Sequence, residues 1–161
     1  MAFEHDVDTR KTLPELDPAC FDEADGNDAV ALLARRVGAK PLRKFSPADL
    51  YGAVSLNVGL PFVAPLAVAL LEDDPLVQAA RHPGDLLTAV LESDTRFWQE
   101  HHDLWSAMLV VLGMAINKIT ELSEEARRKA DPDNPEGVWL PEYLGDDFMG
   151  ALLHFRGIHR D

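Results

Sequence analysis

The sequence predicts an all-α fold, a single compact helical domain of about six helices. The helices are expected to pack around a buried central helix at about residues 61–72 and a long amphipathic helix at about residues 94–129. Three observations predict this class. Apolar residues recur at helical spacing, capping residues and prolines stand where those segments begin, and no segment alternates polar and apolar residues long enough to form a sheet.

Length and composition favour one domain. A chain of 161 residues, 47% of them hydrophobic, can bury a sizeable core, with residues 1–18 expected to form a loosely ordered lead-in. The N-terminal residues lack the apolar segment of a secretory signal, so we expect a cytoplasmic protein. Cys20 is the single cysteine, which excludes an intrachain disulfide, and its acidic surroundings disfavour the reactive thiolate.

The chain is strongly acidic, with a formal net charge of −13. Nucleic acids and anionic membranes are themselves polyanions, so this charge argues against non-specific binding to either. It favours a basic partner. The alternative is that the acidity serves solubility and nothing more.

The first long helix is expected at residues 29–37. Asp28 can cap its start and Gly38 can end it. Five basic residues then stand between Arg35 and Lys44. In a chain with 28 acidic residues we expect them to pair with nearby carboxylates, and an anion-binding site is the alternative.

A second helix is predicted to begin after Ser46. The Ser46 side chain can accept a hydrogen bond from the backbone near Asp49, and Pro47 suits the first helical position. Gly59 can adopt a left-handed conformation and Pro61 can start a new helix, so a sharp turn is expected there.

The central helix at residues 61–72 is apolar almost all round, which is typical of a buried or membrane-spanning helix. The apolar stretch at residues 58–71 is shorter than the roughly 20 residues that a span requires. Pro61 and Pro65 interrupt it, and acidic residues close it. We therefore expect this helix inside a globular core, with no membrane.

Further helices follow the central one. Asp85 is the expected cap of a short helix at residues 86–91. The long helix keeps apolar residues on one face from Phe97 to Ile119, and Gly113 could bend it. Residues 138–140 are expected to be extended, and a last helix is predicted at residues 146–154.

Trp98 and Trp105 stand seven residues apart on one face of the predicted long helix. Core packing is the expected role of both rings. An exposed aromatic hot spot for a partner is the alternative.

The residues that could carry chemistry form no catalytic pattern. His101 and His102 are adjacent, so on a helix they point about 100° apart, and no histidine pair has metal-binding spacing. The acidic segments at residues 22–28 and 131–142 do not fit a calcium loop; in the second, Pro135 occupies a ligand position. We expect no catalytic residue, no cofactor and no metal.

Four segments in order resemble one known family, the bacterial contact-dependent growth inhibition (CDI) immunity proteins. They are KPLRKFSPADL from Lys40, NVGLPFVAPLAVALLEDDPL from Asn57, HPGDLLTAVL from His82, and the aromatic pair Phe97-Trp98. The resemblance implies a cytoplasmic protein that binds and neutralises a toxin domain delivered by a neighbouring cell. Many such toxins are nucleases with basic substrate-binding surfaces, which an acidic protein can occlude.

On this interpretation the contacts with the toxin are made by exposed acidic clusters. Asp49 and Asp85 are left out, because capping already explains them. The candidate toxin-binding residues are Glu72, Asp73, Asp74, Glu100, Asp103, Asp22, Glu23 and Asp25.

Two other functions stay open from the sequence. One is an acidic adaptor or secretion chaperone, which the net charge also suits. The other is a metal-dependent enzyme that uses the histidines, for which a cluster of histidine and carboxylate around a cavity would be required.

Overall fold

The computed structural model of the protein describes residues 7–22, 24–26, 28–128 and 146–159. Within these residues the chain forms helices and no strand, so the predicted all-α class is confirmed. The elements are α1 (Leu13–Leu16), α2 (Ala29–Val37), the 3-10 helix η1 (Leu42–Lys44), α3 (Pro47–Ser55), α4 (Leu60–Asp73), α5 (Asp85–Glu92), α6 (Thr95–Glu100), α7 (His102–Arg128) and α8 (Asp146–Arg156).

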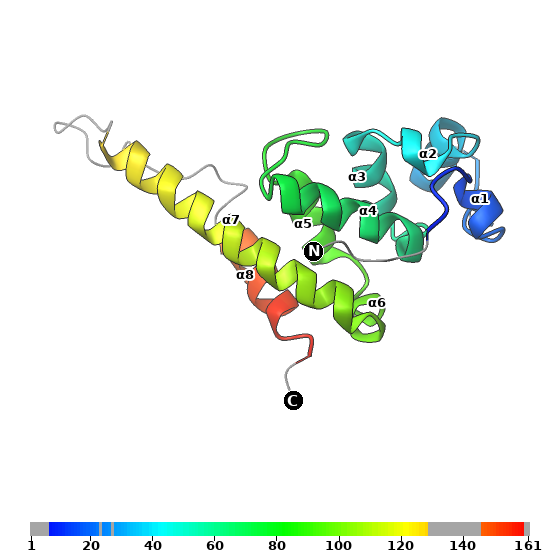
Figure 1. The fold of residues 1–161 in the computed structure, drawn as a ribbon. Helices are drawn as coiled ribbons and strands as arrows, with labels where there is room; N and C mark the ends of the chain where they lie inside the picture. Colours follow the sequence, from blue (N-terminus) through cyan, green and yellow to red (C-terminus); the bar gives the residue numbers. More distant parts are fainter. Residues whose placement is uncertain (1–6, 23, 27, 129–145, 160–161) are drawn as a thin grey trace.

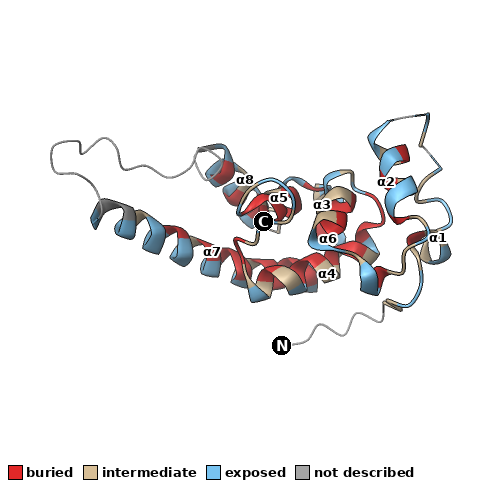
Figure 2. Cartoon of the chain, turned by 90° about the horizontal axis from the view of Figure 1, so that it is seen from above, coloured by how far each residue is buried: buried red, intermediate tan, exposed pale blue. Residues whose placement is uncertain are grey.

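The central helix α4 lies in the core, as predicted. It packs against α3, α5 and α7, and Val63, Ala64 and Ala67 are fully buried on it. Buried residues run along these helices and the first half of α7, whereas the far half of α7 is mostly exposed (Figure 2). The far end of α7 extends beyond the other described helices, and α1 and α2 lie at the opposite end of the molecule (Figure 1).

Local capping starts α2 and α3 where the sequence indicates. The Asp28 carboxylate accepts the backbone N–H of Ala31 at 2.7 Å. Ser46 and Asp49 form a reciprocal capping box at the start of α3, with Pro47 in the first turn. Both predicted starts are confirmed because each depends on a bond that spans three residues.

The corner between α3 and α4 is built from two left-handed residues. Gly59 has φ of +60° and Asn57 has φ of +56°. The Asn57 side-chain oxygen accepts the backbone N–H of Asp94 at 2.9 Å, which ties this corner to the start of α6. The left-handed conformation expected at Gly59 is confirmed.

The predicted long helix at residues 94–129 is two helices in the structure. It breaks at His101, whose φ of −126° and ψ of 64° are not helical, and it continues without a break through Gly113. The His101 ring bonds the carbonyl oxygen of Phe97 through Nδ1 at 2.7 Å and stacks on the Phe97 ring. These contacts hold the corner between α6 and α7. The predicted aromatic stripe is therefore divided between two helices.

Asp85 does not cap a helix, contrary to the prediction. The N-cap of α5 is Gly84, with φ of +84° and no side-chain bond to the helix. Asp85 is the first helical residue, and its carboxylate instead accepts backbone N–H groups from the preceding loop.

Several sequence predictions lie outside the described residues. They include the extended segment at residues 138–140, the acidic segment at residues 131–142 and the first six residues of the lead-in. Within the lead-in, α1 starts with a capping box between Thr12 and Glu15, and Leu13 is fully buried.

Replacing Gly59 with alanine is expected to lower the free energy of unfolding by about 1–2 kcal/mol, because a side chain strains the left-handed backbone. The added Cβ would also stand 2.8 Å from Cδ2 of Leu13. Gly113 is the matched control. A Cβ there meets nothing within 4 Å, so Gly113→Ala should stabilise α7 by about 0.5–1 kcal/mol. Urea unfolding of both variants measures the contrast, and equal effects would contradict it.

Candidate protein-binding surfaces

Two of the five basic residues between Arg35 and Lys44 pair with one buried carboxylate. Asp49 is 3% exposed, and its carboxylate lies 3.0 Å from Nε of Arg36 and 2.7 Å from Nζ of Lys40. Burial opposes ionisation, but hydrogen bonds from Lys40 and Ser46 outweigh it and lower the pKa of Asp49. Pairing of Arg36 and Lys40 with a nearby carboxylate is therefore confirmed.

Two of the three candidate acidic clusters flank the same helix. Glu72, Asp73 and Asp74 stand at the end of α4, and Lys118 of α7 bonds the Asp74 carboxylate at 3.0 Å. Asp103 lies on the first turn of α7. At 1.5 Å per residue, it is about 22 Å along the helix from Lys118. The structure thus places these clusters beside opposite ends of one stretch of α7.

The other candidate acids differ in their surroundings. Glu100 is exposed and pairs with Arg96 one turn earlier, at 3.1 Å. Asp22 and Asp25 are exposed in the turns before α2, at the end of the molecule away from the tip of α7 (Figure 1). Glu23 lies outside the described residues.

Exposed apolar side chains lie on both α7 and α8. Val110 is 64% exposed and Leu153 is 61% exposed, with Met114, Leu122 and Met149 also exposed. By length and composition, the His102–Glu125 part of α7 could cross a membrane. Core helices of globular proteins pass the same test, and the other face of α7 packs Val111, Leu112 and Ala115 into the core.

Both tryptophans of the aromatic stripe are buried, which confirms core packing as their role. Trp98 is fully buried and its indole N–H donates to Ser93 Oγ at 2.8 Å. The indole N–H of Trp105 donates to the carbonyl oxygen of Phe155 at 2.9 Å, and His159 bonds the carbonyl oxygen of Trp98 at 2.7 Å. These contacts attach α8 to α6 and α7.

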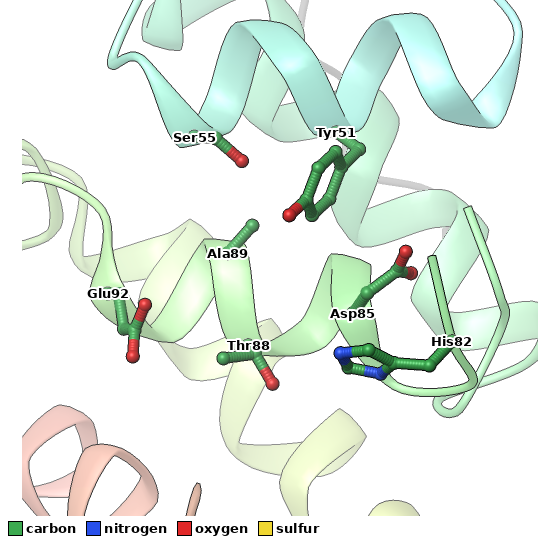
Figure 3. Close-up of a pocket in the computed structure, with 7 residues that line it drawn as sticks. All are labelled: Tyr51, Ser55, His82, Asp85, Thr88, Ala89 and Glu92. Atoms are coloured by element: carbon green, nitrogen blue, oxygen red, sulfur yellow. The ribbon is translucent and has the colours of Figure 1, made fainter. Parts of the chain in front are cut away.

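A recess of about 300 Å³ lies between α3 and α5 (Figure 3). Tyr51 and Ser55 line it from α3, and His82 lines it from the loop that precedes α5. The remaining lining residues belong to α5: Asp85, Thr88, Ala89 and Glu92.

Apolar periodicity and capping residues do not predict this recess. A weak signal was present, because the lining residues stand at helical spacing on each helix, four apart on α3 and three, four and seven apart on α5. Only the packing of α3 on α5 brings the two sets together.

Within the described residues, no group of three or more histidine, cysteine, aspartate or glutamate side chains is arranged to hold a metal ion. Burial raises the pKa of the Cys20 thiol to about 11, with Asp17 and Asp22 adding to the shift. At neutral pH the thiol is protonated, so the expectation of an unreactive cysteine agrees with its surroundings.

The fold and surface define an acidic helical protein with charged and apolar surfaces suited to contacts with another molecule. A comparison with known protein families matches residues 15–108 to the CDI immunity proteins. The chain belongs to this family, as the sequence resemblance implied. No curated protein and no solved structure gives a significant match.

Proposed function

We propose that this protein binds the toxin domain of a contact-dependent growth inhibition system, one to one in the cytoplasm, and neutralises it by occlusion. The family match over residues 15–108 carries this proposal. The net charge of −13 supports a basic partner, such as a nuclease whose substrate-binding surface is positive. No residue of this chain is required to act as a catalyst, because neutralisation needs binding alone.

Coexpression tests the proposal directly. The probe is the C-terminal toxin domain encoded by the gene immediately upstream, expressed with and without this protein. Growth should be rescued when the two are coexpressed, and an immunity protein from an unrelated system serves as the control. Continued killing in cells that contain soluble immunity protein would overturn the proposal.

The acidic cluster at the end of α4 is proposed to speed association. Changing Glu72 and Asp73 together to lysine should lower the association rate about tenfold at low salt, because attraction to a basic surface becomes repulsion. Asp74 is left unchanged, since it pairs with Lys118 and accepts the backbone N–H of Leu76. Thermal stability should change little, because lysine suits the C-terminal end of a helix. Stopped-flow or biosensor kinetics measures the rate.

The same charge change at Asp22 and Asp25 compares this cluster with the candidate cluster before α2, which lies at the other end of the molecule (Figure 1). An equal slowing by the two double variants would assign the effect to net charge. An unchanged rate for the Glu72 and Asp73 variant would remove the cluster from the encounter surface. At about 0.5 M salt the difference from wild type should largely disappear.

A further inference from the structure

The recess between α3 and α5 combines fixed negative charge with several polar side chains that have no partner among the described residues. The Asp85 carboxylate is 2% exposed and accepts the backbone N–H groups of Ala79, Ala80 and Arg81 at 2.7–2.8 Å. Burial opposes its ionisation, yet these bonds outweigh that effect and lower the pKa of Asp85. The carboxylate is thus ionised at neutral pH and held in place.

The open side of the recess offers acceptors. Within the described part of the chain, the Glu92 carboxylate and the hydroxyl groups of Tyr51 and Ser55 make no hydrogen bond or ion pair. The Tyr51 ring reaches from α3 toward α5, and Glu92 stands at the end of α5 (Figure 3). Ser55 and Glu92 are exposed, so a side chain from another molecule can reach them.

The groups that line the recess favour a cationic ligand over an anion or a metal ion. Two carboxylates disfavour an anion, and no three-ligand metal cluster exists among the described residues. A guanidinium has five donors in a planar fork that matches a carboxylate, and it also stacks on aromatic rings. A volume of about 300 Å³ is at the lower end for small-molecule pockets, which suits one long side chain.

We propose that this recess receives a cationic side chain of the toxin domain, an arginine in particular, with Glu92 as its ion-pair partner and Tyr51 as its stacking surface. The inference rests on the proposed function, since it names a contact of the same complex. All seven lining residues fall within residues 15–108, the part of the chain that matches the immunity family.

Affinity of Glu92 variants for the purified toxin domain tests the inference. Glu92→Gln should raise the Kd about tenfold by removing the charge, and Glu92→Arg about a hundredfold by placing a like charge at the site. Glu124→Gln and Glu124→Arg make the same charge changes on the exposed far half of α7 and should stay within about threefold of wild type. Circular dichroism checks that every variant is folded.

A double-mutant cycle then identifies the partner. Arginines and lysines of the toxin domain are changed to alanine one at a time and measured against wild type and Glu92→Gln. One of them should lose at least fivefold less affinity in the Glu92→Gln background than against wild type. Additive losses for every toxin residue, or wild-type affinity for Glu92→Arg, would overturn the inference. If the wild-type protein fails to bind the toxin domain, the proposed function itself is wrong.

Discussion

Replacing Trp98 with alanine is expected to lower the free energy of unfolding by about 4 kcal/mol, in the range measured for large aromatic truncations in cores. The side chain is fully buried, and its ring makes edge contacts with Phe97 and Phe155, each with centroids 5.0 Å apart. Truncation leaves a cavity between α6 and α8 and leaves Ser93 Oγ without its donor. Because whole domains are stable by only about 5–15 kcal/mol, this variant should unfold at a much lower urea concentration than wild type.

Urea unfolding followed by circular dichroism measures this loss. Trp98→Phe is the matched variant, because it keeps an aromatic ring and removes the indole N–H. It should cost about 1–2 kcal/mol. A loss below about 1 kcal/mol for Trp98→Ala would mean that α8 is not held through this ring.

Replacing Asp85 with alanine is expected to cost about 3 kcal/mol, since three backbone N–H groups lose a charged acceptor together. Those groups belong to the loop between α4 and α5, so this loop should lose its order. The shape of the recess that Asp85 lines should change with it. Asp85→Asn keeps the shape but loses the charge, and should cost about 2 kcal/mol. Asp73→Asn, at an exposed position, is the control and should change stability by less than about 0.5 kcal/mol.

The Asp85 contribution also depends on pH with a defined sign. The folded pKa is lower than the ordinary value of 3.8, so the stabilisation is complete well above pH 3.8. It is lost as pH falls through 3.8 toward the folded value, because protons then bind the unfolded state preferentially. The stability difference between wild type and Asp85→Asn should therefore shrink below about pH 4. A constant difference from pH 7 to pH 3 would show that the charge of Asp85 is not involved.

Several features of the fold follow from interactions that span a few residues, and these were predicted from the sequence. The starts of α2 and α3 depend on Asp28 and Ser46 bonding the backbone three residues ahead. The turn at Gly59 depends on a glycine that can take a left-handed conformation. The apolar composition of α4 predicted its burial, because few polar residues could face water.

The failures involve contacts between segments. The break at His101 is the exception, because its ring stacks on Phe97 and bonds the Phe97 carbonyl oxygen only four residues earlier. Apolar periodicity does not record these contacts. Asp85 has the residue type and position of a helix cap, but the backbone of the preceding loop is a better set of donors for it. The recess needs Tyr51 of α3 and Glu92 of α5, which the packing of those helices brings together.

For the candidate binding surface too, some properties follow from the sequence and others only from the packing of the helices. The acidic character and the family are properties of the chain itself, because charge is additive and the family segments are contiguous stretches of residues. Which acids share a surface is a matter of packing: Lys118 bonds Asp74 across 44 residues and places the end of α4 beside α7. Local propensity carries no information on such a distance, because it is set by how the whole core closes around α4.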